Sequence, residues 1–319
     1  MVTQGKIVII GAGHVGSHCA MSLAAGRVGR EIVLVDKEGP KAQAQALDIS
    51  DALSSLPGGP LVRAGTYEDS ADADIVIIAI GEPRLPGQTR LDLLGNSIQM
   101  LGELLGVLGP LNLPGIVISI TNPADIVADF VRRGLGLPRF RAFGTGTLLD
   151  TARLVRLLSE RTGQPRPQIQ AVALGEHGDS SMVPTSSIRI AGRPFESWPQ
   201  LDKAAVVKDT RWAGMEIING KGSTEFGIGQ AVAALCATIL ADEKKVLPLS
   251  VFLDGEYGQH DVHCGVPCRV GRDGIEEIVE LTLAPGEWDE LNQSCEVIRR
   301  HIHMAQDLAG ARQTSDPRK

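Results

Sequence analysis

An apolar run that passes directly into closely spaced glycines is the feature that most restricts the fold of this chain. The run is Lys6–Ile10, and a helix-like segment comes after it. Three glycines stand between the two or open the helix: Gly11, Gly13 and Gly16. At such a junction the first glycine permits a tight turn, the second lets backbone approach a pyrophosphate, and the third allows close helix–strand packing. The stretch predicts a strand–turn–helix unit that binds a dinucleotide.

A second apolar run, Glu31–Val35, ends in an acidic residue, Asp36. A carboxylate at this point can accept hydrogen bonds from a ribose diol and would repel a 2′-phosphate, so the sequence favours NAD over NADP as the cofactor. The alternative is that Asp36 only caps the next turn. We assign two further residues to the same cofactor site: Val15 inside the glycine motif and Gly81 after the run 74–80.

The first half of the chain alternates short apolar runs with longer segments rich in alanine and leucine. The runs are Lys6–Ile10, Glu31–Val35, Asp74–Ile80 and Gly115–Ile120, and the helix-like segments are His14–Ala25, Pro40–Leu53 and Leu91–Leu108. Strands that are apolar on both faces and separated by helix-length crossovers indicate a parallel sheet covered on both sides. This pattern predicts a doubly wound α/β domain of the Rossmann type.

After about residue 145 the pattern changes to that of an α+β domain. Helices are expected near Thr147, from Leu201, over Gly222–Ala241 and over Glu287–Leu308; strands are expected over Ala171–Leu174, Ser187–Ala191, Val246–Leu253 and Val262–Val270. We therefore expect an NAD-binding domain over residues 1–145 and a substrate domain over residues 146–319.

Composition indicates an enzyme that acts on small molecules in the cytoplasm. The 319 residues carry a net charge of −7, with no basic face to suggest nucleic-acid binding, and no apolar run approaches the roughly 18 residues of a membrane span. The first residues lead straight into the glycine motif and do not resemble a signal peptide. Five scattered cysteines give no disulfide framework, which favours a reducing compartment.

Candidate residues for acid–base chemistry lie in two later motifs. LGEHGDSS places His177 in a glycine-flanked turn, and GTLLDTAR places Asp150 and Arg153 three residues apart. Histidine is the natural proton carrier near neutral pH, a carboxylate can orient its ring, and an arginine can bind a substrate carboxylate through two bonds. The alternatives are a structural histidine and an ordinary ion pair on a helix surface, and spacing alone favours the ion pair.

Two loops add further candidates. TNPAD places Asn122 at the carboxyl end of an expected strand, where ligands bind in open parallel sheets; capping of the next helix is an equally good reading. GEPRLPGQTR, residues 81–90, is rich in glycine and proline and carries two cations, Arg84 and Arg90.

These motifs together resemble the L-lactate and L-malate dehydrogenase family, and the later NGKGSTEFGIG and VPCRVGRDGI segments resemble its lactate branch. The resemblance runs from end to end of the chain. It implies an NAD-dependent L-2-hydroxy acid dehydrogenase that moves hydride between the nicotinamide and C2 of a small 2-hydroxy or 2-oxo acid. It also implies a homodimer or a homotetramer.

Residue roles follow from the resemblance alone. It implies that His177 is the acid–base group and that Asp150 orients it. Arg153 would bind the substrate carboxylate, and Arg90, on a closing loop, would polarise the carbonyl. Two residues would complete the substrate site: Asn122, which would also contact the cofactor, and Thr224.

Arg84 leaves the substrate open. It matches the position that faces the substrate side chain, where lactate dehydrogenases typically carry glutamine and malate dehydrogenases arginine. An arginine there would pair with the second carboxylate of oxaloacetate, whereas Thr224 and the lactate-like motifs favour pyruvate. If Arg84 points into solvent, a bulkier 2-oxo acid would also be accepted.

An effector and a metal are weighed on the same grounds. Relatives activated by fructose 1,6-bisphosphate carry a basic pair at positions matching Val155 and Gln170, so we expect no activation of this kind. The cluster His260, Asp261, His263, Cys264 and Cys268 lacks the spacing of zinc ligand sets, so no metal is assigned. Without metal ligands an NAD-dependent glycosidase is a poor alternative, and an NAD-sensing protein would have no reason to keep His177.

Overall fold

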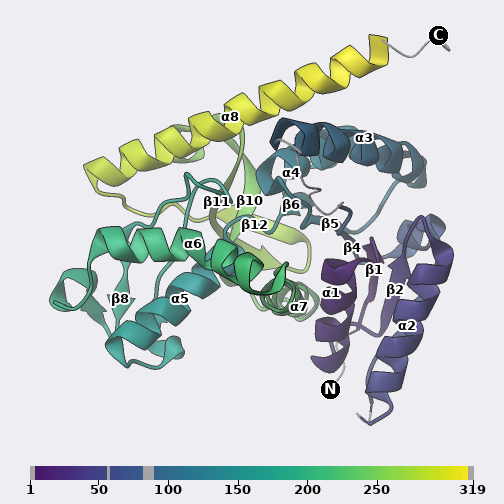
Figure 1. Cartoon of the computed structure of the whole chain (residues 1–319), viewed down its shortest axis with the longest axis horizontal. Coiled ribbons are helices and arrows are strands. Elements are labelled where there is room, and N and C mark those ends of the chain that lie inside the picture. Colours follow the sequence, from purple (N-terminus) through teal and green to yellow (C-terminus); the bar gives the residue numbers. More distant parts are fainter. Residues whose placement is uncertain (1–3, 56–57, 82–89, 315–319) are drawn as a thin grey trace.

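The computed structural model describes residues 4–55, 58–81 and 90–314, with backbone alone for residues 90–93 and 311–314. One nine-stranded sheet runs through the middle of the molecule, with helices on either side (Figure 1). Six of its strands are parallel. In sheet order they are β3 (Leu61–Ala64), β2 (Glu31–Val35), β1 (Lys6–Ile10), β4 (Ile75–Ile78), β5 (Ile116–Ser119) and β6 (Ala142–Gly144).

This order, 3-2-1-4-5-6, is that of the doubly wound dinucleotide-binding fold, so the expected fold class of the first half is confirmed. Four helices accompany these strands: α1 (His14–Ala25), α2 (Gly39–Leu53), α3 (Arg90–Leu108) and α4 (Ala124–Leu135). Strand β3 was not expected, because LVRA is short and only partly buried at the edge of the sheet.

Alternation along β1 shows why the four residues after Lys6 are all apolar. Ile7 and Ile9 belong to a core shared with α1 and α7 (Phe226–Leu240), whereas Val8 and Ile10 belong to a second core shared with α3 and α4. Successive strand residues point to opposite faces, so a strand covered on both faces must be apolar at every position. The same alternation holds along β4.

The second half adds antiparallel strands to the same sheet. They are β10 (Lys245–Asp254), β11 (His260–Gly271) and β12 (Gly274–Ile278), and β10 joins β6 through Ser250 and Gly144. A separate small sheet holds β7 (Ile169–Gln170), β8 (Arg189–Ile190) and β9 (Arg193–Pro194). The helices are α5 (Leu148–Thr162), α6 (Lys203–Lys221), α7 and α8 (Pro285–Thr314), the last running along both halves (Figure 1). The expected α+β character of this half is confirmed.

Short elements account for the differences from expectation. The run Ala171–Leu174 forms only an isolated bridge, from Leu174 to Met182, and β7 lies just before it. The expected helix from Gly222 begins instead at Phe226, because Gly222, with φ +90°, ends α6 in the left-handed conformation. Short 3₁₀ helices lie at Tyr67–Asp72, Gly109–Leu111, Arg166–Gln168, Thr185–Ser187, Phe195–Ser197 and Glu256–Gly258.

No helix in the part of the chain that the structure describes combines the length and the apolar character needed to cross a membrane.

The carboxyl ends of β1, β4 and β5 lie at one edge of the sheet, since neighbouring parallel strands run in the same direction. The glycine turn, Gly81 and the TNPAD loop each follow one of these ends. The fold therefore brings three of the predicted motifs to one edge.

Candidate active site

The three glycines of the first turn have three different surroundings. Gly11 has φ +107°, and a Cβ there would lie 2.4 Å from the Ala79 carbonyl oxygen. A Cβ on Gly16 would lie 1.8 Å from the Gly11 carbonyl oxygen, so only glycine allows α1 to approach β1 this closely. A Cβ on Gly13 would meet nothing within 4 Å. These surroundings agree with a tight turn, close helix packing and a backbone open to a ligand.

A pocket of about 490 Å³ lies beside this turn. Four of the residues predicted for the cofactor site line it: Gly11, Gly13, Asp36 and Gly81. Apolar side chains from α3, including Met100 and Leu104, line the opposite side. The open backbone of Gly13 and the carboxylate of Asp36 fit the pyrophosphate and the ribose of a dinucleotide.

The other cofactor assignments have different positions. Val15 is half-buried and packs against the hydrophobic core, and Gly16 holds α1 against β1, so neither lines the pocket. Asn122 is exposed and precedes a cis peptide bond to Pro123. Pro123 is the N-cap of α4, and no side chain caps that helix, so the capping alternative for Asn122 is wrong.

His177, Asp150 and Arg153 form one bonded series. The His177 Nδ1 atom lies 2.6 Å from one oxygen of Asp150, and Arg153 Nη1 donates to the other oxygen at 2.9 Å. Asp150 lies in the first turn of α5, where a carboxylate also suits the helix dipole, and Arg153 follows one turn later. The residues that the sequence left as a surface pair are mostly buried and share one site, with Arg153 beside Gly214 of α6.

Charge and burial act in opposite directions on the pKa values of His177 and Asp150. Burial alone would lower the pKa of His177, but the carboxylate of Asp150 outweighs it and raises the pKa above its ordinary value. For Asp150 burial favours the neutral acid, yet the nearby His177 and Arg153 charges hold its pKa below the ordinary range. The arrangement stabilises an imidazolium, which is the form that can donate a proton.

Asp125 is a functional candidate that sequence reasoning missed. It is fully buried in α4; one carboxylate oxygen accepts the backbone N–H of His177 at 2.8 Å, and the other accepts the Ser250 hydroxyl at 2.6 Å. Burial raises its pKa to about 6, against the two hydrogen bonds that favour the charged form. Its place in the TNPAD motif was the available signal.

A second missed group reaches the His177 turn from α8. The Ser294 hydroxyl accepts the backbone N–H of Glu176 at 2.8 Å and lies 3.0 Å from the Ser180 hydroxyl. Glu176 in turn accepts from the Ser180 side chain at 2.5 Å. A serine in a long amphipathic helix carries no sequence signal of this role. Together with Asp125, it fixes the backbone N–H groups of Glu176 and His177.

The remaining predicted residues are placed less fully. Thr224 lies half-buried in the α6–α7 loop, two residues before α7. Arg90 begins α3, and its side chain lies outside the described atoms. Arg84 lies outside the described residues altogether. Their expected roles stay predictions.

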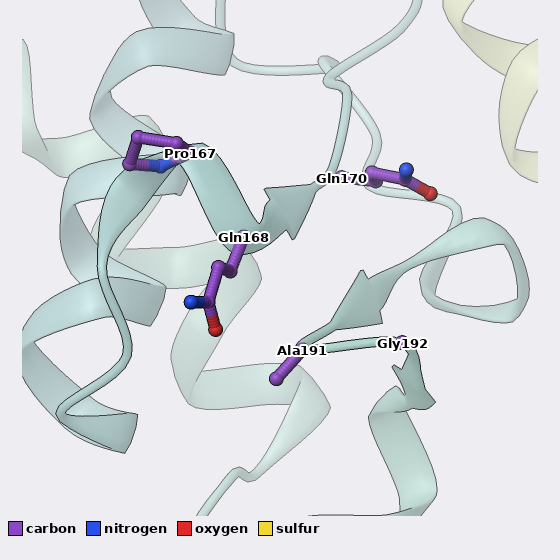
Figure 2. A pocket seen from close by; sticks show the side chains of 5 residues that line it. All are labelled: Pro167, Gln168, Gln170, Ala191 and Gly192. Atoms are coloured by element: carbon purple, nitrogen blue, oxygen red, sulfur yellow. The ribbon is translucent and has the colours of Figure 1, made fainter.

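A second pocket, of about 320 Å³, lies beside the paired strands β7 and β8 and includes Gln170 (Figure 2). The side chains around it carry no charge: they belong to Pro167, Gln168, Gln170, Ala191 and Gly192. The expectation that fructose 1,6-bisphosphate does not activate the enzyme stays a prediction. Within the described residues no cluster of three or more histidine, cysteine or acidic side chains is placed to hold a metal ion.

The fold and the site define a two-part dehydrogenase that uses a nicotinamide dinucleotide. Comparison with known sequences agrees. The model of the lactate/malate dehydrogenase NAD-binding domain matches residues 5–144, and that of the lactate/malate dehydrogenase alpha/beta C-terminal domain matches residues 147–309. The chain belongs to the lactate/malate dehydrogenase family. The predicted family, NAD as cofactor and the dehydrogenase class are confirmed, and they replace the glycosidase and sensor alternatives.

Individual relatives include both named activities. The chain is 37% identical to L-lactate dehydrogenase 1 of Bifidobacterium longum over 94% of this chain and 98% of the relative, and 39% identical to L-lactate dehydrogenase 3 of Bacillus anthracis over 93% and 96%. Its structure is similar to that of the minor L-lactate dehydrogenase of Enterococcus mundtii, with a TM-score of 0.91, 32% identity and coverage of 94% and 98%. It is also similar to malate dehydrogenase from Archaeoglobus fulgidus in complex with NADH, with a TM-score of 0.85, 29% identity and coverage of 94% and 99%.

Proposed function

We propose that the chain interconverts L-lactate and pyruvate with NAD. The observation that carries the proposal is the bonded series of His177, Asp150 and Arg153, since it joins a proton donor and a carboxylate-binding cation in one site. Bound NADH supplies the hydride that reaches C2 of the 2-oxo acid. Residues 1–145 would hold the cofactor and residues 146–319 most of the substrate.

His177 would hold and move the proton. Its Nδ1 atom is engaged by Asp150, which leaves Nε2 to face the substrate oxygen. During ketone reduction negative charge develops on that oxygen, and a protonated imidazole both stabilises the charge and donates the proton. In the opposite direction the neutral ring would accept the proton of the hydroxy acid. The raised pKa of His177 favours the protonated form that reduction needs.

Arg153 would bind the substrate carboxylate. Its Nη1 atom donates to Asp150, and its remaining guanidinium N–H groups can form a two-bond contact with a carboxylate. Asn122 would hydrogen-bond the substrate or the cofactor ribose, and Thr224 would line the pocket near the C2 substituent. Arg90 would polarise the carbonyl once its loop excludes water.

Lactate rather than malate is proposed because relatives named L-lactate dehydrogenase share 37% and 39% identity with almost the whole chain. Arg84 favours the second candidate, malate, since a desolvated arginine beside the methyl group of pyruvate would lack a partner. A pair made in one complex and left unmade in the other is expected to discriminate about a thousandfold.

The deciding measurement is kcat/KM for pyruvate and for oxaloacetate in the wild type and in Arg84→Gln. Preference for pyruvate, little changed by the substitution, supports lactate dehydrogenase. Preference for oxaloacetate that the substitution removes would establish malate dehydrogenase in its place. Turnover of neither acid with NADH would overturn both candidates.

We also propose a cytoplasmic homodimer or homotetramer. The five cysteines are free and buried, which suits a reducing compartment. Exposed apolar side chains on α6, among them Trp212 and Met215, suit a subunit contact. Sedimentation equilibrium would test the assembly, and a monomer at micromolar concentration would contradict it.

A further inference from the structure

The carboxylate of Asp36 is held rigidly at the adenosine end of the nucleotide pocket. One oxygen accepts the backbone N–H of Ala12 at 2.8 Å, and the other accepts that of Glu38 at 3.0 Å. Only 9% of the side chain is exposed. Because backbone amides from two loops fix it, Asp36 cannot turn away from a ligand that brings a second negative charge.

Two lysines stand beside this carboxylate. Lys37 and Lys41 both line the pocket, and the Lys41 ammonium lies 3.6 Å from Asp36. Lys37 forms no ion pair with any carboxylate in the described ranges 4–55, 58–81 and 90–314. Glu38 and Glu103 line the pocket as well, so the site holds acids and bases together. Glu103 belongs to α3, on the apolar side of the pocket, and accepts from Gln99.

The backbone here also favours an anion. Helix α2 begins at Gly39, has Pro40 in its first turn, and has neither a side-chain cap nor an acidic residue in that turn. No acid within the helix opposes the positive end of its dipole, although the N-cap residue just before it is Glu38. This contribution is smaller than that of the two ammonium groups, but it acts in the same direction.

We propose that the adenosine end of the pocket accepts the 2′-phosphate of NADPH through Lys37 and Lys41, so that NADPH is a second, weaker cofactor of this enzyme. Asp36 repels the 2′-phosphate and so sets a preference for NADH, and the two lysines reduce the size of this preference. The inference rests on the proposed dehydrogenase function for its physiological meaning, whereas its test by binding does not.

Charge balance explains why neither cofactor is excluded. The 2′-phosphate carries a charge between −1 and −2 and would lie near the negative charges of Asp36 and Glu38 and the positive charges of two lysines. Charge-assisted hydrogen bonds from ammonium to phosphate are short and strong, and offset the repulsion in part. Both lysines are exposed, so the offset must weaken as salt screens it.

The test measures Kd for NADH and NADPH by nicotinamide fluorescence. It also measures kcat/KM for both cofactors with a 2-oxo acid that the enzyme reduces. In the wild type NADPH is expected to bind about a hundredfold more weakly than NADH, a gap that widens with added KCl. The ratio of the two Kd values is the readout, because it cancels general damage to the pocket.

Three variants separate the parts. Lys37→Met and Lys41→Met are each expected to raise the ratio of Kd for NADPH to Kd for NADH about tenfold. Lys245→Met removes the same charge from an exposed residue on β10 and should leave the ratio unchanged. Asp36→Ser should invert the preference to NADPH, and should not do so in combination with both lysine substitutions.

Two results would overturn the inference. The first is NADPH binding that is more than ten-thousandfold weaker than NADH binding in the wild type. The second is an improvement in NADPH binding by Asp36→Ser that is equal with and without the two lysines. Failure of the proposed function looks different. In that case both cofactors bind with the expected ratio, and no 2-oxo acid is reduced with either one.

Discussion

The glycine turn after β1 and the polar cluster around His177 differ in how they are assembled. The turn consists of consecutive residues, and its fit to a dinucleotide depends on contacts within the first strand, the first helix and the neighbouring strand β4. The cluster takes Asp150 from α5, Asp125 from α4, Ser250 from β10 and Ser294 from α8. A local site is damaged by change in one segment, whereas an assembled site can be adjusted from several.

The largest effect is expected at the centre of the assembled site. His177→Asn removes the proton donor and should lower kcat/KM for the 2-oxo acid by about 10⁴-fold, at the upper end of what acid–base catalysis contributes. NADH binding should persist, because the nucleotide pocket is a separate region. Steady-state kinetics and an NADH fluorescence titration measure the two. Less than a tenfold loss of kcat/KM would remove His177 from the mechanism.

Substitution of Asp150, the partner of His177, should lower kcat/KM by a smaller factor. Asp150→Asn keeps the shape but loses the charge that raises the pKa of His177 and pairs with Arg153. We expect kcat/KM to fall by about 10³-fold, from a misoriented ring with a lower pKa. In pH profiles, the limb where 2-oxo acid reduction declines should move to lower pH. An increase in KM with kcat unchanged would limit Asp150 to positioning Arg153.

The local site can be tested with a matched pair of glycines. Gly11→Ala forces a Cβ into the Ala79 carbonyl at positive φ, and should destabilise folding by about 1–3 kcal/mol. Gly13→Ala meets open space, so stability should hold while Kd for NADH rises about tenfold through contact with the pyrophosphate. Urea unfolding and fluorescence titration separate the two. Equal effects of both substitutions on folding would refute this division of roles.

Sequence reasoning succeeded where the relevant contacts are close in sequence or repeat regularly. All-apolar strands predicted the parallel sheet, and Gly11, Gly13 and Gly16 predicted the turn. The roles of His177 and Asp150 needed the family resemblance, because a lone histidine is often structural and the spacing of Asp150 and Arg153 favoured a surface ion pair. Ser294 was missed because it lies 118 residues from Glu176, and serine is common in exposed helices. Such contacts follow from the packing of α8, which no local pattern encodes.

Ser294→Ala tests this long-range support. The substitution leaves the N–H of Glu176 without its acceptor at a site where Ser294 is fully buried, and frees the turn that carries His177. We expect kcat to fall about tenfold from the looser geometry, with KM and NADH binding nearly unchanged. Ser294→Thr keeps the hydroxyl and should restore part of the rate. Equal rates in the alanine, threonine and wild-type enzymes would show that α8 does not position His177.

Asp125→Asn is expected to have the smallest effect on rate and a distinct effect of pH. Asparagine can still accept from the His177 N–H and donate to the Ser250 hydroxyl, so the turn should keep its place. The negative charge that helps to raise the pKa of His177 is lost, and the declining limb of the reduction profile should move down by less than about one pH unit.

Asp125→Asn should also change how the stability of the protein depends on pH. The folded pKa of Asp125, about 6, lies above that of an unfolded aspartate, so the folded protein binds the proton more tightly. Wild-type stability therefore contains a contribution that is present at low pH and is lost as pH rises through about 6; over this window it should fall by about 2 kcal/mol relative to Asp125→Asn. Urea unfolding at pH 4.5 and 7 measures the difference. Parallel stability curves would show that Asp125 is ionised throughout, and that its charge is already balanced by the polar cluster it helps to assemble.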